Sequence, residues 1–128
     1  MTDEAGHYPY QAQIEAYGNL GFRFAGMSHR GSLLCLPTGM FEWKVTSASE
    51  VTLESLAPIL ALTEEVDVCF IGLGMDIAAL DPAIRQAFRE KNIIVEAIST
   101  GSAVRTYNIL LAEKRAVCAA LIAVEHVR

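Results

Sequence analysis

The sequence lacks any long uninterrupted hydrophobic run, and the longest one, at residues 116–124, has about half of the ~20 residues that a membrane-spanning helix needs. No membrane span is therefore expected. The first ten residues also lack the basic start and apolar core of a signal peptide, and they carry the acidic Asp3 and Glu4 instead. These absences predict a cytoplasmic protein.

Basic residues are few and scattered along the chain. There are 10 Lys and Arg against 15 Asp and Glu, which gives a net charge of −5 at pH 7. Because nucleic-acid binding needs a concentrated basic surface, nucleic acid is not expected as a partner.

Cysteine pairs and metal-ligand spacings are missing as well. Cys35, Cys69 and Cys118 form no CxxC motif, and each lies in an apolar stretch typical of a strand. We interpret them as small buried hydrophobic residues in a reducing compartment. The three histidines are far apart and have no second ligand at zinc spacing, so neither a metal nor another cofactor is expected.

Local signatures of catalysis do not occur. The sequence has no GxSxG elbow and no GxxxxGK[ST] loop. Gly72 and Gly74 begin a dinucleotide-type pattern, but Ile77 stands where the third glycine is required. No catalytic residue is assigned, and an enzymatic activity is not the leading expectation.

The length of 128 residues suits one domain, which we place at residues 13–128 after a flexible arm at residues 1–12. From residue 13 to residue 45 apolar and polar side chains alternate; Phe22 and Phe24, for example, flank Arg23. This period of two predicts antiparallel strands with one buried face. A more buried strand is expected at residues 32–36.

After residue 46 the pattern changes to strands that alternate with helices. Short apolar runs at 66–71, 93–98 and 116–124 predict strands, the last of them in a central position. An amphipathic helix is expected around residues 53–60, and Pro58 leaves its start open.

A second helix is expected to begin at Asp81 and Pro82, and to stop at Asn92 in a left-handed conformation. Crossover connections of this kind favour parallel pairing. We therefore predict a three-layer α/β domain with a mixed, largely parallel central sheet flanked by helices, and an additional antiparallel β layer from the N-terminal third.

In open α/β sheets, ligands lie beyond the carboxyl ends of the strands. Loops 72–76 and 99–102 take this position, and they face one crevice if their strands are neighbours. The second loop opens into a third helix, for which Thr100 is the expected cap. The free amides at the start of this helix and the guanidinium of Arg105 suit an anion. The alternative interpretation is structural: loop 72–76 would be a tight turn, and loop 99–102 would be an ordinary helix cap. The candidate ligand-binding residues are Gly72, Gly74, Asp76, Ser99, Thr100, Gly101, Ser102, Arg105 and Asn108.

Tyr107 and Asn108 of the third helix carry polar groups whose partners matter. Tyr107 falls on the predicted buried stripe, where its ring would be buried while its hydroxyl reaches a loop. Asn108 is a poor helix former, and we expect its side chain to bond something specific: the crevice or a partner.

Residues 100–108 carry the string Thr-Gly-x-Ala-x-Arg-Thr-Tyr-Asn, and further motif residues are Gly31, Ser32, Pro37, Trp43, Gly72, Gly74, Pro82, Glu96, Glu113 and Arg115. Through these residues the chain resembles, from 13 to 124, a family of unknown function that includes the mitochondrial complex I (NADH dehydrogenase) assembly factor and the adipogenesis-associated protein of animals. The resemblance implies a three-layer α/β fold with a mixed sheet and no established enzymatic activity. It also implies, for the mitochondrial member, action through other proteins during assembly of a membrane complex.

Three positions depart from the pattern of that family. Leu73 replaces a threonine between the two glycines, Ser99 replaces an acidic residue, and Lys114 replaces the glycine common before Arg115. The loss of the threonine hydroxyl weakens the case for a polar ligand at the first loop.

Two hypotheses of function follow. The leading one is a non-catalytic binding or assembly module that contacts a protein partner or its own copy. It would be supported by an exposed apolar patch formed by Met27, Met40, Phe41 and Trp43. The alternative interpretation of these four residues is that they fill the core. The alternative is a binder of a small anionic ligand, or an enzyme, that uses the crevice.

Overall fold

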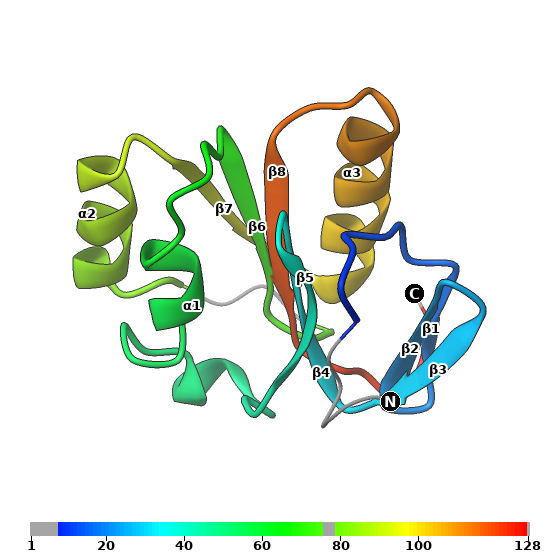
Figure 1. Ribbon diagram of the computed structural model, residues 1–128. Helices are drawn as coiled ribbons and strands as arrows, with labels where there is room; N and C mark the ends of the chain where they lie inside the picture. Colours follow the sequence, from blue (N-terminus) through cyan, green and yellow to red (C-terminus); the bar gives the residue numbers. More distant parts are fainter. Residues whose placement is uncertain (1–7, 76–78, 128) are drawn as a thin grey trace.

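The computed structural model describes residues 8–75 and 79–127 of the chain (Figure 1). In chain order the elements are β1 (Ala16–Gly18), β2 (Gly21–Phe24), β3 (Met27–Arg30), β4 (Ser32–Leu36), β5 (Gly39–Trp43), the 3-10 turn η1 (Ala48–Glu50), α1 (Ala57–Leu60), β6 (Val68–Gly72), α2 (Pro82–Glu90), β7 (Ile94–Ile98), α3 (Thr100–Ala112) and β8 (Val117–Leu121).

The central sheet has the strand order β5-β4-β8-β6-β7. β6 runs parallel to both β7 and β8, whereas β4 pairs antiparallel with β5 and β8. The prediction of a mixed sheet is confirmed, and the parallel pairing is confined to its βαβαβ half. β8 occupies the middle position expected of a continuous apolar strand.

The two faces of this sheet carry separate cores, because successive side chains of a strand point to opposite faces. Cys69, Ile71 and Cys118 pack on the side of α1 and α2. Phe70 and Val117, which alternate with them, pack on the side of α3. Figure 1 shows α2 and α3 on opposite sides of the sheet, as in a three-layer domain.

A second sheet, β1-β2-β3, forms the additional antiparallel layer that was predicted. Phe22 and Phe24 pack from it into the α3-side core. Its two hairpins turn through residue pairs with positive φ: Asn19 and Leu20 at 51° and 61°, then Ala25 and Gly26 at 51° and 74°. Two such residues form the turn whose twist matches that of the strands, so the pairing register is tightly specified.

Residues 8–12 are attached to the domain, although they were expected to belong to the flexible arm. The backbones of Tyr8 and Met40 exchange two hydrogen bonds of 2.8 Å. The side chain of Gln11 donates to the Val117 carbonyl at 2.7 Å. These contacts supply the hydrogen-bond partners that make an ordered terminus stable.

The first helix differs from its prediction, while the second agrees with it. α1 has 4 residues only, and Leu53, expected on its buried side, is 43% exposed. Pro58 in its first turn lacks the amide that a longer helix would need. In α2, the Asp81 carboxylate accepts from the Ala83 amide at 2.9 Å, and Asn92 adopts a φ of 61° after the last turn.

Within residues 8–75 and 79–127, no helix is both long enough and apolar enough to cross a membrane.

Candidate functional site

The two predicted loops do meet at one edge of the sheet, where parallel β6 and β7 end side by side. The Thr100 amide donates to the Gly74 carbonyl at 2.9 Å. The Gly74 amide in turn donates to the Thr100 hydroxyl at 3.0 Å. The loops are therefore in direct contact, and these polar groups already satisfy one another.

Thr100 has a structural role at this junction. It is fully buried, and its hydroxyl donates to the Ile122 carbonyl at 2.7 Å. A Cβ placed at Gly72 would lie 2.9 Å from the Thr100 Cα, so Gly72 permits a close approach of β6 to α3. Burial of Thr100 leaves this part of the crevice filled by the protein itself.

The cap of α3 is Ser99, not Thr100 as predicted. The Ser99 hydroxyl accepts from the Ser102 amide at 3.3 Å, and its φ and ψ are extended. Threonine and serine are both good caps, but Thr100 is already inside the first turn and directs its hydroxyl into the core.

Among the candidate residues on the first turns of α3, Ser102 is half-buried and Arg105 is exposed. Arg105 is exposed and donates from Nη2 to the Ser102 hydroxyl at 3.3 Å. The hydroxyl of Tyr17 lies over Gly101, where an added Cβ would meet it at 2.5 Å. Tyr17 thus brings the small sheet into contact with the start of α3.

Asn108 faces the N-terminal segment, not the crevice. Its Oδ1 accepts from the Ile14 amide and its Nδ2 donates to the Ile14 carbonyl, both at 2.8 Å. Tyr107 is fully buried and its hydroxyl donates to the Ala12 carbonyl at 2.8 Å, which confirms the predicted structural role. Burial raises the pKa of Tyr107.

Asp76 lies outside the residues that the structure describes. Ligand binding by Gly72, Gly74, Ser99, Gly101, Ser102 and Arg105 stays a prediction. In the described part of the chain, no group of three His, Cys, Asp or Glu side chains is placed to hold a metal ion.

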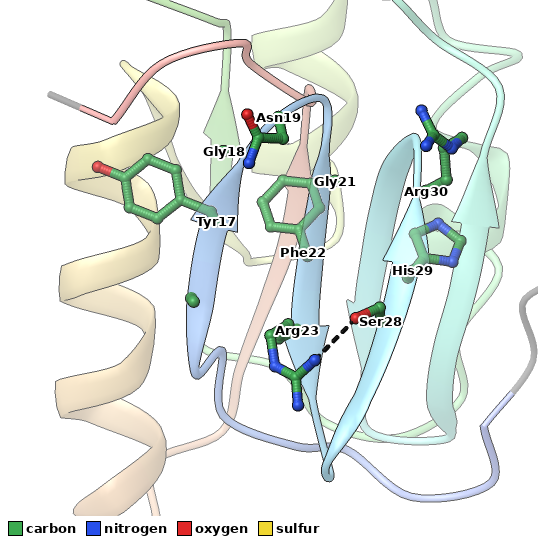
Figure 2. A pocket seen from close by; sticks show the side chains of 10 residues that line it. Tyr17, Gly18, Asn19, Gly21, Phe22, Arg23, Ser28, His29 and Arg30 are labelled. Atoms are coloured by element: carbon green, nitrogen blue, oxygen red, sulfur yellow. Dashed lines mark hydrogen bonds between the residues drawn. The ribbon is translucent and has the colours of Figure 1, made fainter.

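Sequence reasoning missed a cavity of about 480 Å³ on the small sheet. Figure 2 shows the residues that line it, from all three strands and the first turn. We call it the arginine pocket; its lining comprises Ala16, Tyr17, Gly18, Asn19, Gly21, Phe22, Arg23, Ser28, His29 and Arg30. The register pairs Arg23 with Ser28 and Gly21 with Arg30, so both arginines belong to one face.

A second region that sequence reasoning missed is the edge of the central sheet at β7, which pairs with β6 alone among the described residues. Ile94 is 63% exposed there, and a cavity of about 390 Å³ lies between β7 and α2. Arg85 and Arg89 of α2 line this cavity together with Asn92, Ile93, Ile94 and Val95. We call the outward side of Ile94–Ile98 the β7 edge.

The apolar patch suggested for the N-terminal strands does not form. Met40 and Trp43 are buried, with exposures of 0% and 4%, and the Trp43 indole donates to the Ser55 carbonyl at 2.8 Å. Phe41 is half-buried, which leaves Met27, at 42%, as the exposed member of the four. The alternative interpretation, that these residues fill the core, holds for Met40 and Trp43.

The family described as "Protein of unknown function (DUF498/DUF598)" matches residues 14–122 of the chain. The chain belongs to this family. The DUF498 match spans both sheets and the helices α1, α2 and α3 of the described residues, and it confirms the resemblance seen in the motif residues.

Curated relatives of this DUF498 chain include two that differ in length. NADH dehydrogenase [ubiquinone] 1 alpha subcomplex assembly factor 3 of Xenopus tropicalis is 34% identical over 109 residues, which are 85% of this chain and 60% of the relative. An uncharacterized protein of Rhodobacter capsulatus is 38% identical over 109 residues, 85% of this chain and 82% of that protein. The chain thus spans about three fifths of the length of the animal relative.

A solved structure agrees with the fold. The crystal structure described as an outer membrane protein from Bartonella henselae is 46% identical and superposes with a TM-score of 0.89, covering 93% of this chain and all of that one. The mixed sheet with an added antiparallel sheet is therefore the fold of this DUF498 member.

Proposed function

We propose that this DUF498 domain is a non-catalytic protein-binding module that serves the assembly of a larger complex, and that it contacts its partner along the β7 edge. The name of the Xenopus relative, an assembly factor, supports the general role. The observation that carries the proposal is an open sheet edge with an exposed apolar residue, Ile94.

The backbone of β7 has hydrogen-bonding groups to offer. The Ile94 amide donates to the Asp67 carbonyl, and the Ile98 carbonyl accepts from Leu73, so alternate residues 94, 96 and 98 direct their backbone groups toward β6. Val95 and Ala97 consequently direct theirs outward. An extended segment of another protein would pair with these groups, as in recognition by strand addition.

Glu96 is the charged side chain of the β7 edge, and the other four residues of the strand are apolar. The strand is Ile-Val-Glu-Ala-Ile, with no proline or lysine. On the α3 face Ile94 and Glu96 are exposed, whereas α3 covers β6 and β8. Burial of Ile94 against a partner would add an apolar contribution to the hydrogen bonds.

Charge favours a different protein over a second copy as the partner. In an antiparallel self-pairing centred on Glu96, the two carboxylates would lie opposite each other, which destabilises a sheet. Centring on Val95 would bring the arginines of both copies, Arg85 and Arg89, toward one axis. A partner segment with acidic side chains would instead meet these arginines favourably.

Affinity capture from the organism's own cells, read by quantitative mass spectrometry, tests the proposal. Val95→Pro removes an outward amide without touching the β6 ladder, and Ile94→Asp removes the apolar contact. Ile109→Asp on α3 is the matched control, since Ile109 is 58% exposed. Partners held by the wild type and by the control should be lost from both β7 variants. Equal capture by all of them would refute the β7 edge.

We also propose, as a second role, that the surface at the start of α3 binds a small anion through Ser102 and Arg105. The support is an exposed guanidinium next to a helix N-terminus. Thermal-shift screening against anionic metabolites tests it. Arg105→Ala should abolish a stabilising hit, while Arg85→Ala should retain it. Hits that survive Arg105→Ala would rule this site out.

For the compartment we propose the cytoplasm. Cys35, Cys69 and Cys118 are free and buried, which suits a reducing compartment. Fractionation of cells that carry a tagged full-length protein tests this, and recovery in a membrane fraction would contradict it.

A further inference from the structure

We infer that the arginine pocket binds an oxyanion group, phosphate or carboxylate, carried by a small molecule. This site is separate from the β7 edge, and its lining residue Tyr17 also reaches the start of α3. Its volume of about 480 Å³ falls in the range of roughly 300–1,000 Å³ that is common for small-molecule sites. The inference rests on the shape of its floor, on the charge of its walls and on the partners those charges have.

The floor of the pocket is kept bare by the sequence. Ala16 and Gly18 of β1, with Gly21 of β2, carry little or no side chain. A Cβ at Gly21 would lie 2.5 Å from the His29 carbonyl oxygen, and Gly18 has a φ of 130°. Larger residues at either glycine would strain the sheet, so the hollow persists and backbone is accessible to a ligand.

Two arginines, Arg23 and Arg30, line the pocket. Arg23 pairs with Ser28, and Arg30 lies two residues farther along β3, so the two arginines are diagonal neighbours. Diagonal neighbours on a sheet are within reach of long side chains, at roughly 7–8 Å. Both are exposed, and Figure 2 shows them projecting from adjacent strands.

The arginines keep most of their hydrogen-bonding capacity for a ligand. Arg23 donates from Nη1 to the Ser28 hydroxyl at 2.9 Å and has further N–H groups. Within residues 8–75 and 79–127, no hydrogen bond or ion pair engages the side chain of Arg30. The nearby carboxylate of Glu15 accepts instead from the Gly26 amide at 3.1 Å.

Two exposed arginines on one face of the small sheet are placed to attract an anion. A phosphate or a carboxylate meets planar guanidinium groups with paired N–H···O bonds. The Ser28 hydroxyl and the Asn19 amide add neutral donors at the rim. The ligand class is thus a compact anion with several oxygen acceptors.

NMR titration of the ¹⁵N-labelled full chain with inorganic phosphate, and separately with succinate, at low ionic strength tests the site. The amide signals of Gly18, Asn19, Gly21 and Ser28 should shift in a saturable way. Arg23→Ala/Arg30→Ala should weaken the apparent affinity by at least about tenfold, as loss of charged hydrogen bonds implies. The spectrum of the variant itself verifies that it is folded.

Lys44→Ala/Arg115→Ala is the matched control, because it removes two exposed positive charges that lie outside the arginine pocket. It should leave both titrations unchanged. Saturation by phosphate alone would assign a phosphate ligand, and saturation by succinate alone a carboxylate one. Absence of saturable shifts with both probes, or equal weakening by the two double variants, would overturn the inference.

Discussion

The side chain of Asn108 makes two hydrogen bonds with the backbone of Ile14. Its Oδ1 accepts from the Ile14 amide and its Nδ2 donates to the Ile14 carbonyl, each at 2.8 Å. An asparagine side chain thereby acts as a short strand partner for a segment 94 residues away.

Replacement of Asn108 by alanine should lower the free energy of unfolding by about 1–3 kcal/mol, because two partly buried backbone groups lose their partner. Urea unfolding monitored by circular dichroism measures the change. Gln13→Ala is a suitable control, since its side chain donates to the Asn108 carbonyl at an exposed site, and it should cost less than about 0.5 kcal/mol. Equal losses in the two variants would contradict the structural role of Asn108.

Lys114→Gly should stabilise the protein by about 1 kcal/mol. Lys114 has a φ of 62° just after α3, in the left-handed region that costs a residue with a side chain about this much. The Lys114 and Arg115 amides donate to Leu111 and Leu110, which closes the helix in the manner that favours glycine. Asn92→Gly at the end of α2 is the comparison. It should raise the free energy of unfolding by only about a few tenths of a kcal/mol, because asparagine tolerates this conformation. Thermal unfolding decides; no gain at Lys114 would count against the assigned backbone.

Gly72→Ala should destabilise the domain by about 1–3 kcal/mol through overpacking. The added methyl would meet the Thr100 Cα at 2.9 Å and Leu121 Cδ2 at 3.2 Å. Because the nearest atom is backbone, the second change Thr100→Ser should not restore stability in the double variant. Chemical denaturation of the three proteins provides the test, and full rescue by serine would show that the methyl of Thr100, the one group this change removes, sets the limit.

The buried thiols should make the protein sensitive to alkali. Burial raises the pKa of Cys35 above its ordinary value of 9.0, while a hydrogen bond with Cys118, followed by burial, raises that of Cys69. Since the folded state holds these protons more tightly, their contribution is complete below about pH 9 and is lost as the pH rises further. Unfolding curves between pH 8 and 11 should show this loss, and Cys35→Ala should reduce it.

Native protein should also react slowly with a thiol reagent at pH 8, and all three cysteines should react after unfolding. Rapid labelling of the native protein would contradict their burial.

Periodicity in the sequence was enough to predict most strands and the helix that begins at Pro82. It failed around Leu53 because an apolar spacing of three and four also fits a run of turns, and Pro58 denies the amide that a continuous helix needs. At the start of α3 the sequence offers Ser99 and Thr100 as equal caps. The tertiary structure distinguishes them, because Thr100 is buried and its hydroxyl donates to the Ile122 carbonyl.

The arginine pocket had a signal that could have been used. Ala25 and Gly26 form a two-residue turn, which fixes the register of Phe24 opposite Met27 and hence of Arg23 opposite Ser28. Arg30 then necessarily shares a face with Arg23. The exposure of the β7 edge had no local signal, because the sequence of a strand does not state which neighbours the rest of the chain supplies.

Gly31 alone separates β3 from β4, yet these strands belong to different sheets. Its φ of 96° allows the chain to change direction there, and the small sheet lies at the end of the molecule away from β7 and α2 (Figure 1). A metabolite seated over Arg23 and a protein strand docked beside Ile94 would therefore not compete for space. One copy of the domain therefore has room for a ternary complex, with the small molecule at the small sheet and the partner protein at the opposite end of the molecule.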